Sequence, residues 1–162
     1  MRLRLPRRDV TTLLLVAIAT AVYAPAWATG AAVPALSSPV GLWKTIDDHT
    51  GQAKAIVEIR DVNGELAGRV VKLFHPPAPH PLCLKCTGAL KNQPVLGMRI
   101  LWGMHQDADE WTGGRILDPE SGDVYHCSMT LENGGKVLRV RGYMGFSIFG
   151  RTERWDRVEA ER

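Results

Sequence analysis

The feature that most constrains the fold is a series of short alternating runs between residues 111 and 155, separated by clusters of turn residues. In one run Tyr125, Cys127 and Met129 alternate with polar residues. A period of two places apolar and polar side chains on opposite faces of a β-strand. Turn clusters such as residues 118–123 are typical of the tight connections between antiparallel strands. The stretch therefore predicts a meander of strands with one face turned toward a core.

The first 28 residues have the organisation of a secretory signal. Four arginines stand within the first eight residues, an apolar run follows over 11–26, and Ala26-Trp27-Ala28 supplies the small residues of a cleavage site. The apolar run is shorter than the roughly 20 residues that span a bilayer. We expect cleavage after Ala28, a flexible lead-in over 29–40, no membrane span in the mature chain, and a periplasmic or secreted location.

Cleavage changes the charge of the chain. The full sequence has 20 basic and 17 acidic residues, and the signal removes four arginines and one aspartate, which leaves 16 of each sign. A neutral chain lacks the standing basic field that nucleic-acid binding requires. The remaining length is enough for one domain with its own core, but not for two.

Strand-like runs recur throughout the expected domain, residues 41–158. Asn63-Gly64 is a strong short signal for a hairpin turn, and Gly68 inside a run suggests a bulge. About eight short strands with little helix signal predict an all-β fold, a single antiparallel barrel, because closure removes exposed edges. A two-sheet sandwich is the alternative. The clearest strand candidates are 41–46, 54–60, 65–73, 95–105, 110–117 and 150–158.

Residues 74–94 interrupt this rhythm with five prolines and no periodicity. A connection of about 20 residues without regular structure often acts as a lid over a functional site. We therefore predict that this loop covers one end of the barrel.

The same loop contains Cys83 and Cys86. In an oxidising compartment they are expected to form a disulfide, either with each other, the pairing we adopt, or from one of them to Cys127. Redox chemistry at this pair is a further possibility. A metal site is another alternative, because His75 and His80 precede the cysteines at a spacing that could wrap zinc or cuprous ion. A disulfide would remove that site.

Several motifs resemble a known family of small exported bacterial proteins, the domain of unknown function 2147 family. They follow one another over nearly the whole mature chain: Gly41-x-Trp43, Gly113-Gly114-x-Ile116-Leu117-Asp118-Pro119, Gly122-x-x-Tyr125, Arg141-Gly142-Tyr143 and Phe149-Gly150-Arg151-Thr152-x-x-Trp155. This resemblance implies a lipocalin-like β-barrel with no activity established for the family as a whole.

A looser similarity to lipocalins concerns barrel closure. Those barrels have a Gly-x-Trp on the first strand and an arginine on the last strand that packs over the tryptophan and closes one end. The resemblance implies that Gly41 and Trp43 form such a closure with Arg151, Arg154 or Arg157. A cation over an indole ring is favourable by roughly 0.5–2 kcal/mol.

The barrel and its lid suggest a binding protein for one small apolar or amphipathic molecule. The alternatives are a metal- or thiol-handling envelope protein that uses the 74–94 loop, and a pocketless envelope interaction module. Arginines that face the interior could hold an anionic head group. The residues expected to contact a ligand are Trp43, Trp102, Trp111, Arg115, Arg139 and Arg141.

The sequence provides no catalytic residues. It has no nucleophile elbow, P-loop, dinucleotide fingerprint or zinc-binding helix motif. The carboxylates of residues 118–123 lack the ligand spacing of a calcium loop and are explained by a turn. Enzymatic activity is therefore the less favoured class, and no cofactor is predicted.

Overall fold

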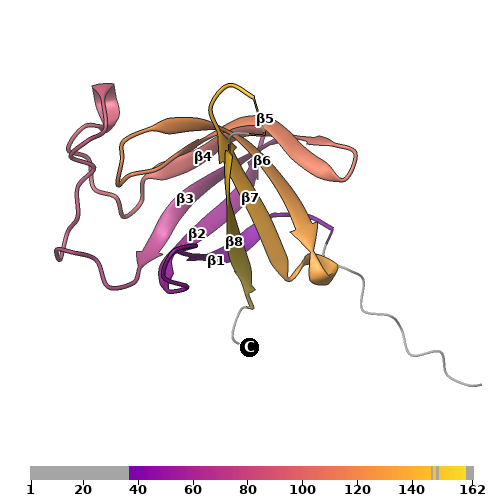
Figure 1. The fold of residues 1–162 in the computed structure, drawn as a ribbon, viewed down its shortest axis with the longest axis horizontal. Coiled ribbons are helices and arrows are strands. Elements are labelled where there is room, and N and C mark those ends of the chain that lie inside the picture. The colour runs from indigo at the N-terminus through magenta and orange to yellow at the C-terminus, as the bar shows by residue number, and fades with distance from the viewer. Residues whose placement is uncertain (1–36, 147, 149, 160–162) are drawn as a thin grey trace, which may run out of the picture. The chain divides into compact units, whose positions relative to one another are not determined.

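The computed structural model describes residues 37–146, 148 and 150–159, so the predicted signal lies outside the described residues. Eight antiparallel strands follow in chain order, and the last pairs with the first to close a barrel (Figure 1). The predicted all-β barrel is therefore confirmed, and the sandwich alternative is wrong. The strands are β1 (Gly41–Ile46), β2 (Ala53–Val62), β3 (Glu65–Leu73), β4 (Arg99–Asp107), β5 (Glu110–Leu117), β6 (Val124–Glu132), β7 (Val137–Tyr143) and β8 (Gly150–Val158).

Helix is confined, in the described residues, to two short 3₁₀ segments, η1 (Gly88–Leu90) and η2 (Asn133–Gly135). Over this part of the chain no helix has the length and hydropathy of a membrane span.

The connections alternate between the two ends of the barrel because successive strands run in opposite directions. One end, which we call the closed end, has the short β2–β3, β4–β5 and β6–β7 turns, together with the start of β1 and the end of β8. The other end, which we call the open end, has the β1–β2, β3–β4, β5–β6 and β7–β8 connections. The longest of these, residues 74–98 between β3 and β4, extends at the left of Figure 1.

Bulges interrupt the strict alternation of side chains. The pairing of β3 with β4 shifts register on both sides of Gly68, as its sequence position predicted. Farther along, Gly103 and Gly113 have φ of +67° and +80°, values that residues with a side chain rarely adopt. These glycines shift the phase of β4 and β5. Leu101 and Met104, three positions apart, consequently both point into the core and are fully buried.

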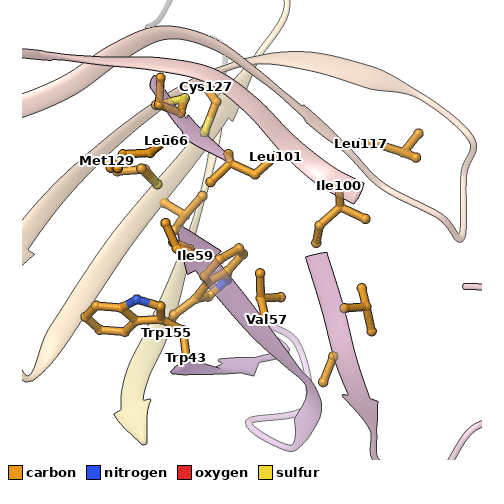
Figure 2. Close-up of a cluster of buried hydrophobic side chains, with 14 of the residues drawn as sticks. Trp43, Val57, Ile59, Leu66, Ile100, Leu101, Leu117, Cys127, Met129 and Trp155 are labelled. Atoms are coloured by element: carbon orange, nitrogen blue, oxygen red, sulfur yellow. The ribbon is translucent and has the colours of Figure 1, made fainter. Parts of the chain in front are cut away.

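One cluster of buried apolar side chains fills the interior of the barrel (Figure 2). Trp43 of β1 and Trp155 of β8 lie on neighbouring strands, and both are almost completely buried. The other strands contribute smaller apolar side chains from their inward positions, so all eight strands meet in one cluster. Further members of this cluster are Ile59, Leu66, Leu101, Cys127 and Met129.

The β3–β4 connection is fixed to the barrel by the segment around its cysteines. Cys83 and Cys86 form a disulfide with Cα atoms 5.4 Å apart, so the predicted pairing is confirmed. Gly122 of the β5–β6 turn packs so closely on Lys85 that a Cβ there would lie 2.3 Å from the Lys85 carbonyl oxygen. The remaining cysteine, Cys127, is buried, and desolvation raises the pKa of its thiol to about 12.

Candidate functional site

A cavity of about 850 Å³ occupies the open end of the barrel. All four open-end connections contribute to its lining, and the inward faces of the strands form its walls below them. Its deeper wall is apolar because the residues at these inward positions are aliphatic or aromatic. They include Ala55, Val57, Val70, Ile100, Val140 and Trp155.

The polar groups within this wall already have hydrogen-bond partners. The Thr45 hydroxyl accepts a bond from the Ala55 N–H at 3.1 Å, and the Trp155 indole N–H donates to the Glu153 carboxylate at 3.2 Å. Throughout the described residues, no buried side-chain nitrogen or oxygen lacks such a partner. An unpaired buried polar group would favour a ligand with a matching polar group. The deep part of this cavity has no such unpaired group among the described residues, so it does not require a polar ligand.

Charged side chains form the rim of the cavity, and one ion pair joins two different connections. The Lys54 ammonium at the start of β2 lies 2.8 Å from the Glu120 carboxylate of the β5–β6 turn and 3.6 Å from that of Asp47. Burial lowers the pKa of Lys54, but Glu120 and Asp47 outweigh this effect, and the net shift is upward. Lys54 is therefore charged and held between two loops.

A second charged group surrounds Arg151 at the start of β8. Its guanidinium donates to both carboxylate oxygens of Asp48, with Nε 2.7 Å from Oδ2, and lies 3.4 Å from Glu153. The hydrogen bond from Arg151 is the main reason that the pKa of Asp48 lies below its usual value. Both rim clusters are thus internally paired.

The tryptophans predicted to contact a ligand do not line the cavity. Trp43 and Trp111 are buried in the core. Trp102 lies on the outer face of β4, because the bulge at Gly103 lets Leu101 and Met104 take the inward positions. The Arg99 guanidinium carbon lies 6.0 Å from the centre of the Trp102 ring.

The predicted arginines also lie outside the cavity lining. Arg115 is paired in register with Trp102 on the outer face. Arg139 is exposed and forms an ion pair with Glu132 at 3.3 Å. Arg141 donates to the Thr152 hydroxyl at 2.9 Å on the neighbouring strand. Leu138 and Val140 take the inward positions of β7. Because neighbouring residues of a strand point to opposite faces, Arg139 and Arg141 point outward.

The residues that do line the cavity had a signal in the sequence. Every second position of β8 is occupied in turn by Arg151, Glu153 and Trp155. Because alternate side chains of a strand point to the same face, an inward direction for Trp155 would have predicted an inward direction for all three. The resemblance to lipocalins offered Arg151, together with Arg154 and Arg157, as a closing arginine. Arg151 instead lies at the open end, opposite the closure.

At the closed end, Arg157 makes the predicted contact with Trp43. Its guanidinium carbon lies 4.2 Å from the centre of the Trp43 ring. The same side chain donates to the carbonyl oxygens of Gly135, Ser38 and Val40 at 2.6, 2.7 and 2.9 Å. The last residues of the lead-in are thereby attached to the barrel.

Of the other residues predicted to close the barrel, one belongs to the closure and one does not. Gly41 belongs to the closure, because its φ is +139° and a Cβ there would lie 2.8 Å from Arg157 Nη1. Arg154, by contrast, points outward from β8 and pairs with Asp156 at 2.9 Å. Arg157 is therefore the closing arginine, rather than Arg151 or Arg154.

The structure does not assemble the alternative metal site. Both sulfurs of Cys83 and Cys86 are joined in the disulfide and cannot act as thiolate ligands. The described part of the chain contains no group of three or more His, Cys, Asp or Glu side chains placed to hold an ion, so His75 and His80 do not belong to one. The alternative of a pocketless interaction module is also not supported, because the barrel contains a cavity.

One solved structure of similar fold is described as "Protein HP1028 from the human pathogen Helicobacter pylori belongs to the lipocalin family". The two structures align with a TM-score of 0.66 and 17% sequence identity, over 75% of this chain and 84% of that chain. At this identity the likeness concerns the fold alone. Among curated proteins, none matches this sequence. The family model described as "Uncharacterized protein conserved in bacteria (DUF2147)" matches residues 41–157, which include almost the whole barrel, and the chain therefore belongs to that family.

Proposed function

We propose that this protein binds one small apolar or amphipathic molecule in the open-end cavity. The observation that carries the proposal is the cavity of about 850 Å³ with an apolar wall. Pockets that hold small molecules usually have volumes of about 300–1,000 Å³ and predominantly apolar linings. The lipocalin-like fold supports the same proposal by analogy.

The distribution of polar groups indicates how such a molecule would lie. Its apolar part would contact the deep wall formed by residues such as Val57 and Val140, where burial of apolar surface is favourable by about 25 cal/mol per Å². A polar head would remain at the rim, near Lys54 and Arg151. This orientation leaves no charge buried without a partner.

We further propose that the protein acts outside the cytoplasm. The proposal rests on the signal-like sequence of residues 1–28 and on the Cys83–Cys86 disulfide, a bond that persists in oxidising compartments. Fractionation of a bacterium that expresses the full chain, followed by N-terminal sequencing, tests it. A cytoplasmic product that retains Met1 would contradict this part of the proposal.

The binding proposal is tested with a cavity-filling variant and a matched control. Ala55→Phe adds a ring to the cavity wall, whereas Ala67→Phe adds the same ring to β3 at a position outside the lining. We expect Ala55→Phe to weaken binding of a fluorescent fatty-acid analogue about tenfold or more, and Ala67→Phe to leave it unchanged. Equal affinity in both variants, or no binding by the unaltered protein, would contradict the proposal.

Native mass spectrometry of protein recovered from the cell envelope gives an independent answer. A bound lipophilic species that disappears on denaturation would support the proposal and reveal the mass of the molecule. The same species bound to Ala55→Phe at full occupancy would contradict the assigned position.

A further inference from the structure

The most exposed apolar side chains of the described residues gather at the open end. Phe146, Ile148, Leu84 and Met144 are 79%, 75%, 67% and 60% exposed, and all belong to the β3–β4 or β7–β8 connection. Leu84 and Met144 also line the cavity, so apolar surface continues from its interior onto the outside. We call these four residues the apolar rim. Large exposed apolar side chains beside a cavity mouth are characteristic of an interaction site.

Positive charge accompanies the apolar rim. Residues 66–106 contain five lysines or arginines and no aspartate or glutamate, although acidic and basic residues are nearly balanced over the whole sequence. Within this stretch Lys85 and Lys91 are exposed on the β3–β4 connection. Neither has a carboxylate within ion-pair distance among the described residues.

The nearest acidic turn, residues 118–123, forms no ion pair with these lysines, and one of its carboxylates is paired elsewhere. Glu120 pairs with Lys54 at 2.8 Å, and Asp118 accepts a hydrogen bond from the Glu120 N–H at 2.9 Å. Asp123 lies within hydrogen-bond distance of the Tyr125 hydroxyl, at 3.4 Å. The two lysines therefore remain available to an external anion.

We propose that the open end docks on an anionic lipid bilayer. Phe146 and Ile148 enter the interface between head groups and acyl chains, and Lys85 and Lys91 face lipid phosphates. Surface-bound proteins combine these two elements, because apolar burial and attraction to anionic lipid add to each other. The two connections that contain the apolar rim, residues 74–98 and 144–149, include Lys85 and Lys91 and no acidic residue, so their charge complements that of the bilayer. Docking places the cavity mouth against the lipid. The proposal does not depend on the cavity binding a ligand.

The apolar contribution is tested by sedimentation with sucrose-loaded vesicles of phosphatidylglycerol and phosphatidylethanolamine. The test variant is Phe146→Ser with Ile148→Ser, neither of which lines the cavity. The matched control is Val40→Ser with Val62→Ser, two exposed apolar residues at the closed end. All proteins are the exported product of the full chain, so their N-termini are identical. We expect the test variant to lose about tenfold in vesicle affinity and the control to lose less than about twofold.

The electrostatic contribution is tested by Lys85→Gln with Lys91→Gln, against Lys44→Gln with Lys136→Gln on the barrel wall and at the closed end. We expect the open-end pair to lower affinity about tenfold and the control pair to have a smaller effect. Substitution of phosphatidylcholine for phosphatidylglycerol should produce a similar loss, and so should high salt.

Several outcomes would overturn the proposal. One is the absence of vesicle binding by the unaltered protein, and another is equal binding by the test and control variants. A self-association that the Phe146 and Ile148 variant abolishes, without vesicle binding, would assign the apolar rim to a second copy of the chain instead. The fatty-acid analogue is titrated against the same variant in the absence of vesicles. Retained probe affinity with lost vesicle binding separates docking from ligand binding, and each can fail alone.

Discussion

The two ends of the barrel are held by different kinds of interaction. At the closed end, Arg157 donates to three backbone carbonyl oxygens and covers the buried ring of Trp43. At the open end, Lys54 and Arg151 pair with carboxylates of other side chains, of which that of Glu120 is largely exposed. A backbone carbonyl has little freedom, whereas an exposed side-chain pair contributes only about 0–1 kcal/mol. We infer that the closed end contributes more to the stability of the fold than the side-chain pairs of the open end.

The largest expected effect is at the closed end. Trp43→Ala should lower the free energy of unfolding by about 3–5 kcal/mol, because Trp43 is completely buried and its removal leaves a void. Trp102→Ala, at a partly buried position on the outer face, should lower the free energy of unfolding by about 1 kcal/mol. Urea denaturation measures both variants. Equal losses in the free energy of unfolding would show that Trp43 in the closed-end core contributes no more to stability than Trp102 on the outer face.

The second prediction compares two arginines of β8. Arg157→Lys keeps the charge but not the planar donor groups that reach three carbonyls, and it should cost about 1.5–3 kcal/mol. Arg151→Lys alters an exposed pair and should cost less than about 1 kcal/mol. Thermal unfolding of the two variants decides the comparison, and a larger loss for Arg151→Lys would reverse it.

A smaller effect is expected for the ion pair across the cavity rim. In a double-mutant cycle, Lys54→Met and Glu120→Gln should show a coupling of about 0.5 kcal/mol, because Glu120 is largely exposed. High salt should reduce it further. A coupling well above 1 kcal/mol that resists salt would mean that the rim is as firmly held as the closed end.

The smallest effect concerns pH. Hydrogen bonds from the Thr50 backbone and hydroxyl, the largest cause, lower the pKa of Asp47 from its ordinary 3.8 to about 2. A lowered pKa means that the folded protein favours the ionised carboxylate. Its stabilisation is therefore complete above about pH 4 and is lost as the pH falls toward 2. Unfolding curves of Asp47→Asn should depend less steeply on pH in this range, and an unchanged slope would contradict the assignment.

Much of the fold was predictable, because local signals and global architecture agree. The period of two and the turn residues placed β1, β3, β5 and β8 at the boundaries that the structure has. Gly41 and Trp43 were recognised by their resemblance to the lipocalin closure. These features depend on residues close together in the sequence, whose spacing alone carries the signal.

The cavity was less predictable, because inward and outward positions depend on where bulges occur. Gly103 and Gly113 change the phase of β4 and β5, so Trp102, which was expected to contact a ligand, lies on the outer face. The glycines themselves were visible, but a glycine in a strand does not specify the direction of the shift. The choice of Arg157 over Arg151 likewise required knowing which end of β8 meets the start of β1.

The closing strand pair also has a consequence for the order of folding. Leu42 lies opposite Val158, 116 positions later, whereas every other strand pair joins consecutive strands. Contacts between distant segments form slowly, because the intervening chain must first lose entropy. The β1–β8 seam should therefore form last, and changes to Arg157 should accelerate unfolding more than they retard folding. During synthesis the barrel stays open until β8 has emerged, and an unclosed chain of this kind suits the export that we propose.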